Sequence, residues 1–291
     1  MKKILFLLPV LMLFWACNNQ PDDENSTDID SLENDIDSVS TEVELVYQVP
    51  SPDDFFSLVD PKKYPFKSGL IIDEKKEAVN QQAKELRLGI IVADMAYLST
   101  FDQLTTSVKY FTRVRELSDQ LGLTSVIPVQ TMQKIEQNMA EKDSLKSISE
   151  NSFFNIVQAL EESGNGKTLA VISAGGWIES MYLSTNLVKK FSADDQLVQR
   201  LMSQKIIYEN VLNNMIRFNE SQEVSDLITK FETIGAVYDK VEKEIIAENT
   251  NKTDSSSKVI GNKSKWIIDE NTFKEFKVQV EALRNEFVEQ Y

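Results

Sequence analysis

The distribution of proline constrains the fold of this 291-residue chain more than any other feature. The seven prolines lie at positions 9, 21, 50, 52, 61, 65 and 128, so none occurs in 66–127 or in 129–291. Proline breaks helices because it has no N–H donor and its ring clashes with the preceding turn. The chain also has only nine glycines, the other common helix breaker. Two long segments are therefore permissive for helix.

Apolar spacing agrees with this inference. Val108, Phe111, Val114, Leu117 and Leu121 recur at intervals of three and four residues, the pattern of a helix with one buried face. We expect an all-α fold, an irregular antiparallel multi-helix bundle of about eight or nine helices. The expected helices lie near residues 52–60, 74–100, 103–121, 129–142, 144–162, 167–191, 193–219, 222–248 and 270–290.

Local signals place several helix ends. Ser51 before Pro52 suits the start of a helix, and Ser192 is expected to cap another. Gly122 and Gly164 suit the left-handed position that follows a helix. Residues 249–263 are polar, and we expect a mobile loop there. The organisation predicted from these signals is a single helical domain over residues 46–291.

The N-terminus has the layout of a secretory signal. Lys2 and Lys3 precede an apolar stretch, residues 4–15, which is shorter than the roughly 20 residues that span a bilayer. We expect residues 1–16 to be a signal peptide. The sole cysteine, Cys17, follows Ala16 and resembles the lipobox of bacterial lipoproteins, although Phe14 and Trp15 depart from that pattern. The resemblance implies acylation of Cys17, palmitate included, and a membrane partner through this anchor. The alternative is an ordinary signal peptide followed by a structural cysteine.

An acidic segment follows the cysteine. Residues 18–44 contain ten Asp or Glu and no Lys or Arg, so they bury too little apolar surface to fold. We expect a disordered acidic tether over residues 17–45. Its start resembles the export signal of Bacteroidota lipoproteins, carried here by Gln20, Asp22, Asp23 and Glu24. The resemblance implies an outer-membrane lipoprotein on the cell surface, with a periplasm-facing location as the alternative.

Three short triplets resemble an O-glycosylation acceptor of the same phylum. Each consists of Asp, then Ser, then an apolar residue, and the candidate acceptors are Ser31, Ser38 and Ser144. Such triplets are frequent by chance, and the two in the expected tether are the stronger candidates.

Two heptapeptides echo each other. "DMAYLST" begins at Asp94 and "ESMYLST" at Glu179, and in each the acid is followed three positions later by a tyrosine, Tyr97 or Tyr182. That spacing puts acid and tyrosine on one helical face, and the echo is consistent with an internal helical duplication. The two acids stand among apolar residues. Either they form a buried polar cluster that sets helix register, or they bind a cation or polar ligand as a pair.

The segment before Glu179 has two adjacent glycines that allow two explanations. Gly175 and Gly176 lie inside an expected helix, where they cost roughly 1–2 kcal/mol together relative to alanine. Close helix packing is one explanation. A ligand pocket with Trp177 as its wall is the other.

The segments "QVPSPDDFFSLV", "LRLGIIVADMAYLSTFDQ", "LSDQLGL" and "SAGGWIESMYLS" resemble uncharacterised all-helical lipoproteins of the Bacteroidota, over about residues 45–250. The resemblance implies the helical fold and the envelope location. It implies no activity.

Composition limits the chemistry. The chain has no histidine, and its one cysteine is assigned to lipid, so we expect no catalytic residues, no metal site and no cofactor. The net charge is −15 without a basic stripe, so nucleic acid is not an expected partner. We expect a monomeric, non-enzymatic protein with a binding, scaffold or envelope-interaction role and an unnamed protein or glycan partner. The alternative is a receptor for a small polar ligand or cation at Asp94 and Glu179.

Overall fold

The computed structural model describes residues 51–73, 75, 77–125, 130, 133, 137, 156–246 and 263–289. The expected signal peptide, Cys17, the export signal and the tether lie outside these residues. So do Ser31, Ser38 and Ser144, the expected helix 129–142 except for residues 130, 133 and 137, and most of the expected loop 249–263.

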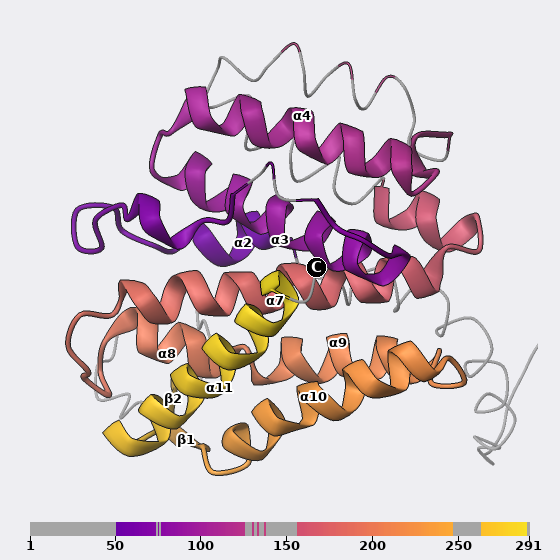
Figure 1. The fold of residues 1–291 in the computed structure, drawn as a ribbon. Helices are drawn as coiled ribbons and strands as arrows, with labels where there is room; N and C mark the ends of the chain where they lie inside the picture. The colour runs from indigo at the N-terminus through magenta and orange to yellow at the C-terminus, as the bar shows by residue number, and fades with distance from the viewer. Residues whose placement is uncertain are drawn as a thin grey trace, which may run out of the picture. The chain divides into compact units, whose positions relative to one another are not determined.

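The described residues form an all-α fold, as the sequence predicted (Figure 1). The N-terminal half contains the short helix α2 (Pro52–Phe56), the 3-10 turns η1 (Ser68–Leu70) and η2 (Leu123–Ser125), and the helices α3 (Gln81–Thr100) and α4 (Leu104–Gln120). A helical segment over 156–162 leads to α7 (Gly166–Leu187). The helices α8 (Gln196–Ser203), α9 (Lys205–Ile216), α10 (Gln222–Tyr238) and α11 (Glu270–Glu289) follow.

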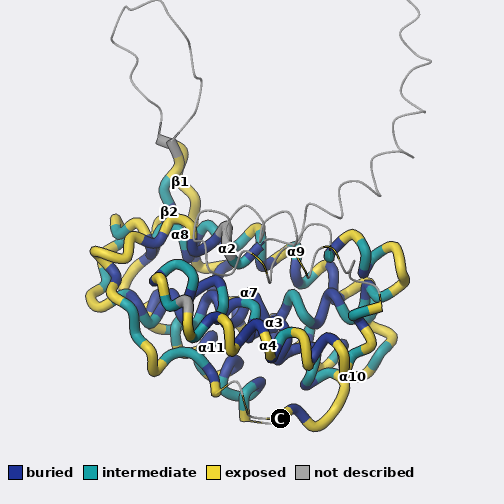
Figure 2. The backbone as a smooth tube through the Cα atoms, turned by 90° about the horizontal axis from the view of Figure 1, so that it is seen from above, coloured by how far each residue is buried: buried dark blue, intermediate teal, exposed yellow. Residues whose placement is uncertain are grey.

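The centre of the bundle is the pair α3 and α7, which pack on each other over most of their length. Figure 1 shows α4 on one side of this pair and α9, α10 and α11 on the other. The buried residues concentrate along the same two helices (Figure 2). Glu85, near the start of α3, contacts Thr168, near the start of α7, and Gly89, further along α3, lies beside Gly176, further along α7. The two helices therefore run in the same direction. The chain can return to a parallel course because α4 and 156–162 intervene.

Helix ends follow local chemistry in most places. Gly122 and Gly164 have positive φ angles of 72° and 75° directly after helices, as expected for glycine at that position. The helix α3 begins later than predicted, because Asn80 caps it and accepts a hydrogen bond from the amide of Ala83. The cap of α8 is Asp195 rather than Ser192, and its carboxylate accepts from two amides of the first turn.

Two expected helices are interrupted. The helix predicted over 193–219 breaks at Gln204 into α8 and α9. The helix predicted over 222–248 ends at Tyr238, and the chain continues as the strand β1 (Glu242–Ile246).

The strand β1 pairs antiparallel with β2 (Lys263–Ile267), which was predicted partly as loop. Figure 2 shows that exposed residues predominate along β1. The side chain of Gln199 holds β2 against α8: its oxygen accepts from the Trp266 amide at 2.9 Å, and its nitrogen donates to the Trp266 carbonyl at 2.8 Å. The ring of Trp266 is itself buried.

Candidate functional site

Glycines set the distance between α3 and α7. A Cβ atom on Gly89 would collide with the carbonyl oxygen of Ile172, and one on Gly175 would collide with the carbonyl oxygen of Leu86. Only glycine therefore allows the two backbones to approach this closely. This contact explains why α7 tolerates adjacent glycines at a cost in helix propensity.

Both acids of the repeated heptapeptide lie in this interface. Asp94 on α3 and Glu179 on α7 are fully buried, with 0% exposure. The carboxylate of Glu179 accepts two hydrogen bonds from Arg284 of α11, at 2.9 Å from Nε and 3.1 Å from Nη2. The same Nη2 donates to the carbonyl oxygen of Leu70 at 3.1 Å. One guanidinium thus joins α7, α11 and the η1 turn.

Asp94 has a different set of partners. Its Oδ2 accepts from the amide of Ile72 at 3.1 Å, and its Oδ1 accepts no hydrogen bond within the described residues. Burial, together with the nearby Glu179 carboxylate, raises the pKa of Asp94 well above its usual value. The pKa of Asp94 is raised well above its usual value, whereas Glu179 is held by two hydrogen bonds from a cation, so we assign a proton to Asp94.

The net charge of the three side chains is close to zero, because the charges of Glu179 and Arg284 cancel and Asp94 is neutral. Glu179 is ionised against Arg284, whose pKa is raised by Glu179 against the opposing effect of burial. Asp94, which carries the assigned proton, is neutral. We call Asp94, Glu179 and Arg284 the buried triad. It satisfies the requirement that a buried charge be paired and hydrogen-bonded.

The two tyrosines of the repeat have unlike roles. The hydroxyl of Tyr97 accepts from the backbone amide of Lys67 at 2.9 Å, and its ring packs against Phe66 and Phe101. The ring of Tyr182 lies under the guanidinium of Arg284, 4.2 Å from its centroid, in a cation–π contact. Tyr182 therefore belongs beside the triad, whereas Tyr97 fastens the segment before η1.

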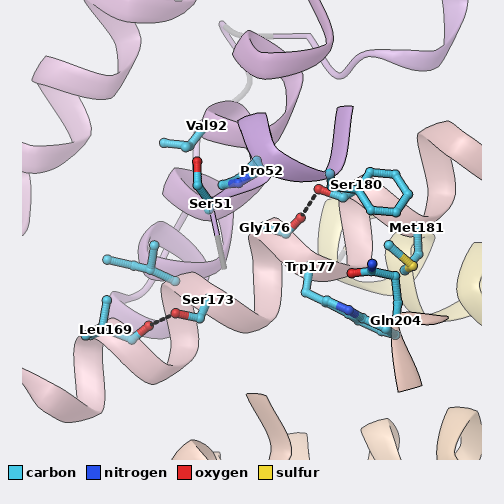
Figure 3. A pocket seen from close by; sticks show the side chains of 13 residues that line it. Ser51, Pro52, Val92, Leu169, Ser173, Gly176, Trp177, Ser180, Met181 and Gln204 are labelled. Carbon is cyan, nitrogen blue, oxygen red and sulfur yellow. Dashed lines mark hydrogen bonds between the residues drawn. The ribbon is translucent and has the colours of Figure 1, made fainter. Parts of the chain in front are cut away.

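Trp177 lies apart from the triad, although only one residue separates it from Glu179. Its ring packs in an aromatic cluster with Tyr208, Phe231 and Tyr238. It also lines a cavity of about 60 Å³ between α2, α3 and α7 (Figure 3). Gly89 and Gly176 line the same cavity, so the close packing and the pocket arise from one helix crossing. Neither Asp94 nor Glu179 is part of the lining.

The sequence did not point to Arg284. The guanidinium bound to Glu179 comes from α11, 105 residues away in the sequence. A signal was present: Arg284 falls four residues after Val280 and eight after Phe276, on the buried face of α11. A lone arginine within an apolar stripe indicates a buried acidic partner.

In the part of the chain that the structure describes, no group of three or more acidic, histidine or cysteine side chains is placed to hold a metal ion. No helix within the same residues is both long and apolar enough to cross a bilayer.

Comparisons of the chain with protein-family models, with curated proteins and with solved structures find no match. The resemblance to Bacteroidota lipoproteins therefore stays a prediction from the sequence.

Proposed function

We propose that this chain is a lipid-anchored, extracytoplasmic and non-enzymatic protein with a binding, scaffold or envelope-interaction role. The anchor is Cys17, the tether is residues 17–45, and the folded helical part is displayed at the outer membrane, facing the cell surface. The single basic–apolar–Cys pattern and the acidic stretch after it support this location.

The observation that supports a non-enzymatic role is that the carboxyl groups of the buried triad contact only other groups of the same chain and not solvent. Asp94 and Glu179 are the acids that the sequence marked as candidate functional groups. Both are 0% exposed, and the charge of Glu179 is neutralised by two hydrogen bonds from Arg284. A general acid or base must reach a substrate. These carboxyl groups reach other parts of the same chain instead.

The same geometry weighs against the alternative of a cation receptor at Asp94 and Glu179. The position beside Glu179 that a cation would need is taken by a guanidinium. A cation would have to displace Arg284, which would lose its bond to Leu70 and its contact with Tyr182 as well. We therefore propose that the triad fastens α11 to the centre of the bundle.

Metabolic labelling with a fatty acid tests the anchor. The wild-type chain should incorporate acyl label and partition into detergent, and the Cys17→Ala variant should do neither. Ser38→Ala, in the same tether, serves as the matched control and should keep both properties. An unlabelled, water-soluble wild-type chain would contradict the proposal.

A further inference from the structure

The cavity beside Trp177 has features that the proposed role of the triad does not use. It lies between the start of α2, the middle of α3 and the middle of α7, with Gln204 at the α8–α9 break (Figure 3). Val92, Ile172 and Ser173 are partly exposed and lie at its outer side, whereas Trp177 and Gln204 are buried. A small molecule could therefore enter past the first three residues and reach the last two.

The polar groups around the cavity differ in whether they already have a hydrogen-bond partner. The hydroxyls of Ser173 and Ser180 donate to carbonyl oxygens of their own helix, at 2.7 and 2.8 Å, as the dashed lines in Figure 3 show. The indole Nε1 of Trp177 has no hydrogen-bond partner within the described residues, although the residue is only 5% exposed. A buried donor without an acceptor is uncommon in folded proteins and calls for an explanation.

The amide of Gln204 lies at the same end of the cavity as this indole (Figure 3). The residue is 4% exposed, and its side-chain amide carries both a donor nitrogen and an acceptor oxygen. An oxygen placed beside these two groups could accept from the indole N–H and from the amide NH₂. The unpartnered indole N–H and the Gln204 amide, which both line one apolar cavity, define a place for an acceptor atom.

Charge and size narrow the class of ligand. None of the thirteen lining residues is charged, so a carboxylate or ammonium group in the cavity would have no counter-ion. At about 10–15 Å³ for each water-sized group, 60 Å³ holds about four to six such groups. The structure thus favours a short apolar body with one oxygen acceptor.

We propose that this cavity binds a small neutral molecule, or the neutral end of a larger amphiphile, through an apolar segment and an oxygen that accepts from Trp177 and Gln204. This site is separate from the triad and does not depend on the lipid anchor.

Nuclear magnetic resonance of the indole groups tests the proposal directly. The probe protein is the chain from residue 17 to 291 with Cys17→Ser, so that neither lipid nor detergent competes. It contains two tryptophans, Trp177 and Trp266, and Trp177→Phe assigns their indole signals. The ligands are 2-pentanone, pentane and pentanoate, which share a chain length and differ in the oxygen group.

We expect 2-pentanone to move the Trp177 indole proton downfield and saturably, with a dissociation constant on the order of 1 mM. The Trp266 signal should stay in place and so report an intact fold. Pentane should bind without the downfield shift, and pentanoate should not bind. Equal shifts of both indole signals, or no saturable shift with the ketone, would overturn the proposal and leave the cavity as a site for water.

Variants separate the contribution of the cavity space from that of the Gln204 amide. Val92→Phe should fill the cavity and abolish the ketone shift, whereas Val108→Phe, at a position that is 48% exposed on α4, should leave it unchanged. Gln204→Leu should weaken the ketone about three- to tenfold with little effect on pentane, because it removes one donor. Unchanged ketone affinity in both Val92→Phe and Gln204→Leu would contradict the assigned site.

Discussion

Arg284, near the end of the chain, binds Glu179 in the middle of α7 through two hydrogen bonds of 2.9 and 3.1 Å. The pair connects positions 105 residues apart in the sequence. The central helix and the last helix are thereby joined at a point that solvent does not reach. The stability of the bundle should depend on this connection more than on any ion pair at the surface.

Removal of the guanidinium should be costly. Arg284→Leu leaves the buried Glu179 carboxylate without its cation, and the free energy of unfolding should fall by about 3–5 kcal/mol. Lys240→Met is the matched control, because Lys240 and Glu275 form an ion pair whose side chains are 50% and 42% exposed. Its loss should cost less than about 1 kcal/mol. Urea denaturation of both variants measures the difference, and equal losses would refute the importance of the buried pair.

The protonation of Asp94 predicts a dependence on pH. Its pKa is raised in the folded state, so the folded chain holds a proton that the unfolded chain loses above about pH 4. The contribution of this group to stability is therefore full at low pH and declines as the pH rises towards the folded pKa. Asp94→Asn imitates the protonated acid, because the amide is neutral and can accept from Ile72.

The variant should thus gain in melting temperature relative to the wild type as the pH is raised from about 5 to 8. Glu116→Gln, at a carboxylate that is 55% exposed, is the control and should show no such trend. A constant difference between Asp94→Asn and wild type across this range would show that Asp94 is ionised in the folded state.

The close contact between α3 and α7 makes a prediction about glycine. Gly89→Ala places a methyl group against the backbone of Ile172, so the helices must separate. We expect a loss of about 1–3 kcal/mol or more, although alanine is the better helix former. Gly69→Ala meets no atom within 4 Å and should change stability by less than about 0.5 kcal/mol. Thermal unfolding of the two variants provides the comparison.

The proposed export signal can be tested without the folded domain being altered. Replacement of Asp22, Asp23 and Glu24 by alanine should leave the protein in the membrane fraction and remove it from the cell surface. Protease treatment of intact cells measures surface exposure. Substitution of Glu42 and Glu44, two acids at the far end of the tether, controls for charge alone. If the triple variant is digested as fast as the wild type, the stretch is only part of the tether.

The helical fold was predictable because its signals are local. Each signal acts only on the few residues around it. These signals are the absence of proline, the spacing of apolar residues and the glycines at 122 and 164. The burial of Asp94 and Glu179 was also predictable, since each stands among apolar residues on a helix.

The parts that sequence reasoning missed depend on distant contacts. Residues 242–246 have the composition of a helix, but they pair with 263–267, and Gln199 then holds the second strand. Arg284 could be recognised as an unusual residue on an apolar stripe, yet its partner lies on another helix. Periodicity does not encode which helices become neighbours, so neither contact follows from it.

The central claim is that the buried triad is a structural connection rather than a ligand site. Thermal melts of the wild type and of Glu179→Gln, each with and without calcium or magnesium, test it most directly. The account predicts that the substitution lowers the melting temperature and that neither cation changes it in either protein. A rise in the melting temperature of the wild type with calcium or magnesium, lost in Glu179→Gln, would contradict the account and establish a cation site.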